Sequence, residues 1–350
     1  MVSSRGLHEE PGADPGGPAP EAAPPLIARV FAALADGHFH SGEQLAAELG
    51  VSRSAIWKAA TALRELGATL HAVRNRGYRL AHGSEALDAG IVRAHLGRDV
   101  RGHVTHIEAA WSIPSTNSWL LDRPNPAPGT TELCLAEYQS AGRGRRGRVW
   151  LAPPGAALCF SLSWTFREVP PDFGSLSLCL GVCALRVLKS LEVAGVALKW
   201  PNDLLAGDRK LGGVLVELRA ESTGPACVVV GIGINVALGT QALQKIAQAG
   251  TTATDLVSSG LAAPRRNALA AALTSACVRG LRQYEREGLK PFIAEWRAAD
   301  TLRGRPVNVS TVNGTAQGFA RGIDLHGALL LDTPDGVQRF VSGDVTVRAE

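Results

Sequence analysis

The chain has 350 residues, of which 45% are hydrophobic, and its formal net charge is +4. The hydrophobic share excludes a wholly disordered chain, and the small charge excess excludes a surface that is basic throughout. A site for a polyanion must therefore be local, and a chain of this length is expected to form two or three domains.

Residues 1–25 are rich in proline, glycine, alanine and acids, and they contain no apolar segment of the kind found in a secretory signal. They are predicted to be a disordered tail. None of the six cysteines belongs to a CxxC pair, which favours small core residues over a zinc or redox site. These features predict a cytoplasmic protein with no membrane span and no protein-bound metal.

Residues 26–82 predict three short helices followed by a two-stranded ribbon. Ser41 and Gln44 have the spacing of a capping box, and Ser52 is the expected cap of the third helix. The segment carries seven Lys and Arg against four Asp and Glu, so it holds +3 of the net charge. This pattern favours a winged helix-turn-helix that binds DNA; the alternative is a helical bundle for protein contacts. The residues expected to contact DNA are Ser52, Arg53, Ser54, Arg74 and Arg76, whereas Trp57 is interpreted as a core residue.

Residues 83–300 predict a mixture of strands and helices, and residues 301–350 predict short strands separated by Asn-Gly, His-Gly and Asp-Gly turns. Strands are expected within 133–138, 158–165, 196–199, 213–217 and 226–231, and helices at 176–191 and 267–287. The final strands are predicted to form a small β-barrel.

The segment Gln139–Trp150 combines four arginines with three glycines. Glycines allow a backbone to approach a polyanion closely, and guanidinium groups neutralise and grip phosphate. The segment lacks the GK[ST] ending of a P-loop. A phosphate-binding loop that orders when an anion binds is favoured over an RGG-like nucleic-acid tract or a solvated loop.

Four further motifs follow or precede this loop. They are Ser115-Thr116-Asn117, Lys199-Trp200-Pro201-Asn202-Asp203, Lys210-Leu211-Gly212-Gly213 and Gly231-Ile232-Gly233-Ile234-Asn235. Taken singly, the first is typical of a helix cap and the last of a packed strand with a turn. A lysine and an acid at the end of a buried strand, however, are suited to holding a nucleotide phosphate.

In this order, the five motifs resemble those of the biotin protein ligase family. The winged helix resembles that of the bifunctional form, which is also the biotin operon repressor. The resemblance covers about residues 26–348. It implies an α+β multidomain chain: a winged helix-turn-helix at 26–82, a mixed α/β catalytic domain related to class II aminoacyl-tRNA synthetases at 83–300, and an SH3-like barrel at 301–350. The predicted tail, 1–25, lies outside the resemblance.

The family resemblance also implies a reaction. Biotin and ATP form biotinyl-5′-AMP with the assistance of Mg²⁺, and biotin is then transferred to a lysine of the biotin carboxyl carrier protein of acetyl-CoA carboxylase. The implied catalytic residues are Lys199, Arg145 and Arg148. The implied biotin site consists of Ser115, Thr116, Asn117, Gln139, Arg143, Gly144, Arg145, Lys210, Gly213 and Gly233. The implied ATP site consists of Arg145, Arg146, Arg148, Trp150, Lys199, Asn202, Asp203 and Asn235.

A second loop near residues 236–241 is expected to order around the adenylate and to favour a homodimer on operator DNA. Three hypotheses follow: a bifunctional ligase and repressor, a ligase whose winged helix is architectural, and a biotin-sensing transcription factor without ligase activity. The intact phosphate motifs argue against the third.

Overall fold

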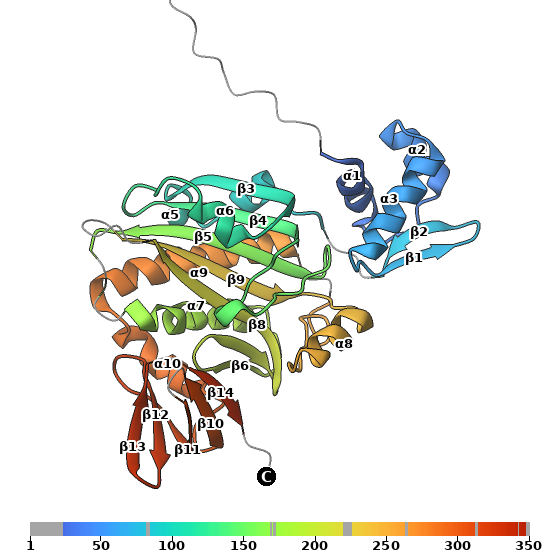
Figure 1. Cartoon of the computed structure of the whole chain (residues 1–350). Helices are drawn as coiled ribbons and strands as arrows, with labels where there is room; N and C mark the ends of the chain where they lie inside the picture. Colours follow the sequence, from blue (N-terminus) through green and yellow to red (C-terminus); the bar gives the residue numbers. More distant parts are fainter. Residues whose placement is uncertain are drawn as a thin grey trace, which may run out of the picture.

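The computed structural model describes residues 24–81, 85–168, 170, 173–219, 226–262, 265–311, 314–341 and 343–347. The predicted tail lies outside these residues, apart from positions 24 and 25. A helical part with a hairpin and a small C-terminal sheet lie at opposite ends of a larger central sheet (Figure 1).

The N-terminal part contains the three predicted helices and the predicted ribbon. The elements are α1 (Leu26–Leu34), α2 (Gly42–Leu49), α3 (Arg53–Glu65), β1 (Leu70–Val73) and β2 (Gly77–Leu80). The capping box of Ser41 with Gln44 is present, and the Ser52 hydroxyl accepts from the backbone of Ala55. The helices pack on a separate apolar core that includes Val30, Leu45 and Leu63.

The expectation that Trp57 belongs to this core was wrong. The inward face of α3 is filled by Ile56, Ala59, Ala60 and Leu63, all buried, and Trp57 faces solvent with 59% of its surface exposed. The cause is helical geometry. Each residue is rotated by about 100° from the one before it, so the Trp57 side chain points away from the stripe that these four residues form.

The chain then passes through α4 (Ala89–His95) and α5 (Arg98–Arg101) into the central sheet. A buried ion pair anchors this connection: Arg266 donates to Glu137 at 2.7 Å, and both side chains are almost fully buried. Arg266 also donates to the carbonyl of Glu85, and Glu137 accepts from the backbone of Leu87 at 2.6 Å. Residues 85–87 are therefore fixed against the central sheet and α9.

The central sheet has seven strands in the order β3-β4-β5-β9-β8-β7-β6, antiparallel except for the β3–β4 pair. Its strands are β3 (Val104–Ile113), β4 (Thr131–Gln139), β5 (Ala157–Phe166), β6 (Val196–Lys199), β7 (Asp203–Ala206), β8 (Arg209–Arg219) and β9 (Ala226–Asn235). The five predicted strands are present, whereas β3 and β7 were not predicted. β3 mixes polar and apolar residues without strict alternation, which conceals its period.

Two long helices, α7 (Leu176–Ser190) and α9 (Arg266–Glu287), cover one face of the sheet. The segment 173–190 is long and apolar enough to cross a membrane. However, 67% of it is buried within the protein, as expected of a core helix. The shorter α6 (Thr116–Leu121) contacts β4, β5 and β9. A further helix, α8 (Thr240–Gln248), was not predicted; it follows the loop expected near the adenylate.

The C-terminal sheet is joined to the center by α10 (Ile293–Ala298). Its five antiparallel strands run in the order β13-β12-β11-β10-β14. They are β10 (Pro306–Thr311), β11 (Gly314–Ile323), β12 (Leu329–Thr333), β13 (Gly336–Phe340) and β14 (Asp344–Val347). Val307 and Leu331 belong to the same apolar core as the central helices, and the buried indole of Trp200 donates to the Gly327 carbonyl at 3.0 Å. The two sheets are thus packed as one unit.

Candidate functional site

The two faces of the central sheet differ in side-chain size. On β5, β9 and β8, one face carries large core residues such as Phe160, Val230 and Val214. Because side chains alternate along a strand, the residues between them point to the other face. That face carries mostly small side chains: Cys159 and Ser161 on β5, Gly231 and Gly233 on β9, and Gly213 on β8. It leaves room for α6 and for the arginine-glycine loop.

A buried chain of hydroxyl and amide groups links α6 to this face. The backbone and hydroxyl of Thr116 both donate to Gln139 Oε1, at 2.7 and 3.1 Å. The Thr116 hydroxyl also lies 2.6 Å from Ser161 Oγ, which donates to Asn117 Oδ1. Asn117 Nδ2 then donates to Glu217 at 2.7 Å. The predicted residues Thr116, Asn117 and Gln139 therefore form one uncharged network.

Ser115 begins α6 as its N-cap, as the isolated motif suggested, and is buried. Its neighbour Asn117 lies against Gly231: a Cβ at Gly231 would come 2.4 Å from Asn117 Oδ1. The glycine is required here so that the asparagine can reach the sheet.

The arginine-glycine loop is a compact turn. Arg143 and Val149 form an isolated antiparallel bridge, and the Gly144 amide donates to the Arg148 carbonyl at 2.7 Å. Arg146 and Gly147 at its tip have φ values of 54° and 73°, in the left-handed region. The tip is strained at Arg146, because a non-glycine side chain rarely adopts this conformation.

The four arginines of this loop point to three different elements. Arg143 donates to Glu217 on β8 at 3.0 Å, and Arg145 donates to Asn202 Oδ1 at 3.3 Å. Arg146 and Arg148 both pair with Asp344 on β14, at 3.1 and 2.8 Å. The loop therefore connects the hydroxyl–amide network, the Lys199–Asp203 motif and the C-terminal sheet.

Arg145 lies deepest of the four. Burial lowers the pKa of its guanidinium, the neighbouring Arg146 and Arg148 lower it further, and Asp344 and Asp203 oppose this. A cation in this position is held at an electrostatic cost, which an added anion would relieve.

Two lysines from separate motifs come together at the end of β7. Lys210 forms an ion pair with Asp203, Nζ to Oδ1 2.6 Å. Lys199 is paired with Asp203 across the β6–β7 register, but within the part of the chain described here its ammonium makes no ion pair or hydrogen bond. Burial lowers the pKa of Lys199, with Lys210 and Arg148 adding to the effect and Asp203 opposing it. Among the described residues, the site is thus electropositive: Arg145 is bonded only to a neutral amide, and the Lys199 ammonium has no polar partner.

Trp150 closes the loop onto the sheet. A Cβ at Gly233 would come 2.6 Å from the Trp150 ring, so the indole occupies the space that the glycine leaves. Gly213 has ordinary room around it, whereas a Cβ at its neighbour Gly212 would come 2.4 Å from the Gly233 carbonyl. The close approach between β8 and β9 is therefore at Gly212, while the room beside Gly213 leaves its predicted place in the biotin site open.

The two asparagines of the predicted nucleotide site make bonds to the backbone. Asn202 Nδ2 donates to the Val214 carbonyl at 2.7 Å, which leaves Oδ1 to accept from Arg145. Asn235 Nδ2 donates to the carbonyls of Lys210 and Thr254 and ties β9 to the segment before residue 255. Asn202 lies beside the cations, and Asn235 serves the architecture around them.

Three residues of this arrangement were missed. Ser161 is a polar residue in a strand whose ten residues are all buried, and Glu217 is an acid within the apolar run of β8. Both were detectable as polar breaks in a buried strand. No local signal in its flanking sequence marks Asp344, because its importance comes from Arg146 and Arg148, almost two hundred residues earlier.

The residues predicted to contact DNA are exposed at the start of α3 and at the turn of the ribbon. Ser52, Arg53, Ser54, Arg74 and Arg76 are all exposed. The Arg76 guanidinium lies 4.2 Å from the centre of the Phe39 ring, a cation–π contact that holds it at the ribbon tip.

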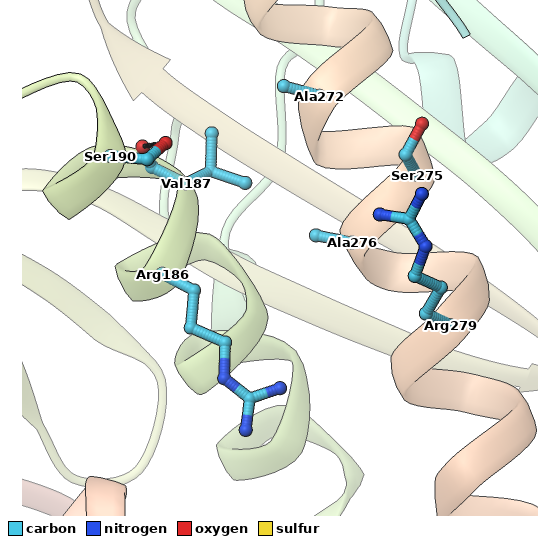
Figure 2. A pocket seen from close by; sticks show the side chains of 7 residues that line it. All are labelled: Arg186, Val187, Ser190, Ala272, Ser275, Ala276 and Arg279. Atoms are coloured by element: carbon cyan, nitrogen blue, oxygen red, sulfur yellow. Dashed lines mark hydrogen bonds between the residues drawn. The ribbon is translucent and has the colours of Figure 1, made fainter. Parts of the chain in front are cut away.

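Other candidate sites carry none of this chemistry. All six cysteines are free and buried, and burial raises the pKa of Cys159 to about 12, so its thiol is not a nucleophile. Within the described ranges, no group of three His, Cys, Asp or Glu has the arrangement of a metal site. A cavity of about 440 Å³ lies between α7 and α9, flanked by Arg186 and Arg279 (Figure 2), and contains none of the motif residues.

Comparison with known proteins agrees with the geometry. Residues 110–235 match the Biotin/lipoate A/B protein ligase family, residues 30–79 match an HTH domain, and residues 303–348 match the Biotin protein ligase C terminal domain.

Full-length relatives extend these matches. The chain is 39% identical to the bifunctional ligase/repressor BirA of Salmonella typhimurium, over 91% of this chain and 97% of the relative. It is 38% identical to BirA of Escherichia coli, over 92% and 97%. The biotin protein ligase from Aquifex aeolicus in complex with biotin and ATP is 25% identical and superposes with a TM-score of 0.56, covering 71% of this chain and 99% of that one. The chain therefore belongs to the family of bifunctional biotin protein ligases and repressors.

Proposed function

We propose that this chain forms biotinyl-5′-AMP from biotin and ATP and transfers biotin to a lysine of the biotin carboxyl carrier protein of acetyl-CoA carboxylase. In the first step a biotin carboxylate oxygen bonds to the α-phosphorus, and pyrophosphate leaves. In the second step the carrier amine bonds to the biotinyl carbonyl, AMP leaves and the ammonium proton is lost. No side chain needs to act as a nucleophile.

The observation that carries the proposal is the bond from Arg145 to Asn202, which spans 57 positions of sequence. It brings the arginine-glycine loop to the strand end that holds Lys199 and Asp203. Two anions must meet in the reaction, so the main barrier is repulsion and orientation, and a cluster of fixed cations reduces both.

The roles proposed for the three catalytic cations follow from where they lie in the site. Lys199 is proposed to stabilise charge on the α-phosphate, because its ammonium is buried and unpaired, with Arg145 and Arg148 as the other catalytic cations. Arg148 is now held by Asp344, so it must exchange that carboxylate for phosphate.

The two substrates are proposed to bind on either side of these cations. The biotin set is Ser115, Thr116, Asn117, Gln139, Arg143, Gly144, Arg145, Lys210, Gly213 and Gly233. The ATP set is Arg145, Arg146, Arg148, Trp150, Lys199, Asn202, Asp203 and Asn235.

Mg²⁺ belongs to the proposal as the counterion of ATP. Asp203 is the one carboxylate among the residues proposed to bind ATP, and it is paired with the Lys210 ammonium at 2.6 Å. The chain therefore offers Mg²⁺ at most one or two ligands beside the phosphates, which is the usual arrangement for this ion. Bound there, Mg²⁺ would neutralise phosphate charge.

The repressor activity is proposed to respond to the adenylate. The loop before α8 contacts the winged part: a Cβ at Gly239 would come 2.3 Å from Thr69 Oγ1. Ordering of the loop at 236–241 by the adenylate would therefore change the contact with Thr69, the residue that precedes β1. A cytoplasmic homodimer that presents two winged parts to a palindromic operator completes the proposal.

The domains of the chain are proposed to be a winged helix-turn-helix at 26–82, a synthetase-like catalytic domain at 83–300 and an SH3-like barrel at 301–350.

A direct assay tests the ligase activity. Purified protein is mixed with biotin, MgATP and a carrier domain, and the carrier is probed with streptavidin; labelling that requires all three additions is expected. Absence of labelling, together with absence of biotin-dependent exchange of pyrophosphate into ATP, would overturn the proposal.

A second assay separates the bifunctional protein from a ligase with an architectural winged helix. Binding to the gene's own upstream duplex is measured with and without biotin and ATP, and the two substrates are expected to tighten it. Sedimentation under the same conditions is expected to show a dimer. Labelling of the carrier without any DNA binding would show that the protein is a ligase whose winged helix is architectural.

A further inference from the structure

Trp57 is the most exposed tryptophan of the chain. Of seven tryptophans, three are fully buried and three are partly buried, whereas 59% of the Trp57 surface is exposed. Leaving so large an apolar group in water forgoes the free energy of burial. Within the described ranges, the indole makes no hydrogen bond, ring contact or cation–π contact that would account for its position.

The indole lies on an exposed side of α3, the second helix of the helix-turn-helix. Ile56, Ala59 and Leu63 bury the inner face. Helical spacing places Trp57 on the outer face, one turn from Arg53 and one turn from Thr61. The Thr61 hydroxyl donates to the Trp57 carbonyl at 2.9 Å, so it is directed to the helix backbone.

Exposed basic side chains outnumber acidic ones on α3 and the ribbon, where Glu65 is the exposed acid of the helix. Arg53, Lys58 and Arg64 are exposed on the same helix, and Arg74 and Arg76 are exposed on the ribbon. The occupant of this surface must therefore be an anion with an apolar component. The same surface of a second copy would bring like charge and be repelled, whereas duplex DNA brings phosphates on both sides of a groove.

We propose that Trp57 enters the major groove and reads the 5-methyl group of a thymine. The methyl is the apolar group that base edges present in this groove, and it is absent from the other bases. A tryptophan has two side-chain torsions, so ordering it costs little entropy relative to its contact area. This inference rests on the proposed DNA binding and adds a base preference to it.

The experiment replaces thymine by uracil, which removes the methyl and leaves the hydrogen-bonding edge unchanged. A preferred duplex is first selected from random sequences with the wild-type protein, biotin and ATP. Each thymine of a half-site is then replaced in turn. One replacement is expected to weaken wild-type binding about fourfold, the effect of burying one methyl group. The same replacement is expected to leave Trp57→Ala unaffected.

Two controls separate this contact from other effects. Arg76→Ala is expected to weaken all duplexes alike, to reduce the salt slope by about one and to keep the uracil effect. Trp57→Ala is expected to unfold at the wild-type temperature, because the side chain fills no core space. A uracil effect that persists in Trp57→Ala, or no uracil effect in the wild type, would overturn the inference while leaving DNA binding in place. Failure of the wild type to select any duplex would overturn both.

Discussion

The hydroxyl–amide network and the arginine-glycine loop lie side by side but are built in opposite ways. The network is buried, and its hydroxyl and amide groups, such as those of Thr116 and Ser161, are bonded to one another. The guanidiniums of the loop are partly exposed and are held by carboxylates from distant elements, such as Asp344. A buried polar network is costly to break, whereas exposed ion pairs contribute little and exchange readily. We therefore expect the network to keep its arrangement when a ligand binds, and the loop to rearrange around an anion.

The largest expected effect is at the point where the two parts meet. Arg145→Ala removes the most buried guanidinium of the arginine-glycine loop and its bond to Asn202. Biotin-dependent exchange of pyrophosphate into ATP is expected to fall by about 10²–10³, the loss typical of one charge-stabilising donor. Arg305→Ala, which breaks an exposed pair with Asp208, is the matched control. Exchange at the wild-type rate in Arg145→Ala would contradict the assignment of the loop.

A buried carboxyl outside the network shows what an incompletely bonded group costs. Burial raises the pKa of Asp300 from 3.8 to about 6, and its Oδ2 has no hydrogen-bond partner among the described residues. The folded state therefore binds more protons than the unfolded state between about pH 4 and 6, so stability falls as pH rises through this window. By pH 7 the loss reaches up to about 3 kcal/mol.

Asp300→Asn removes this titration. The free energy of unfolding of the variant minus that of the wild type is expected to grow as pH rises from 4 to 7, measured by urea denaturation. A difference that stays constant over this range would show that Asp300 titrates normally.

Thr116→Val tests the rigidity of the network. The substitution keeps the shape but removes the hydroxyl shared by Gln139 and Ser161. Unfolding is expected to become easier by about 1–3 kcal/mol, and KM for biotin is expected to rise while KM for ATP stays constant. Thr130→Val, at an exposed turn, is the control for the loss of a threonine hydroxyl. An unchanged KM for biotin would separate the network from the biotin site.

Asp344→Asn gives the smallest expected change. It releases Arg146 and Arg148 from the carboxylate that positions both. Because exposed pairs contribute at most about 1 kcal/mol, stability is expected to change little, and KM for ATP is expected to fall by up to about fivefold, since Arg148 no longer has to give up a carboxylate when phosphate binds. A rise in KM for ATP would instead show that Asp344 holds the two arginines in the position that binds phosphate.

The predicted elements were found wherever local signals were strong. The capping box at Ser41, the cap at Ser52 and the apolar run of α7 depend on neighbouring residues, and all are present. β3, β7 and α8 were missed because their apolar periodicity is weak or short, and their place is decided by the strands and loops beside them.

The sequence by itself determined the motifs, the winged helix and the family, because glycines, caps and clustered arginines act over a few residues. Only the tertiary structure decided which partner each arginine of the loop meets, that β8 approaches β9 closely at Gly212, and that Trp57 faces solvent. The physical reason is that charge pairing and burial depend on which distant segments come into contact, and spacing along the chain does not contain that information.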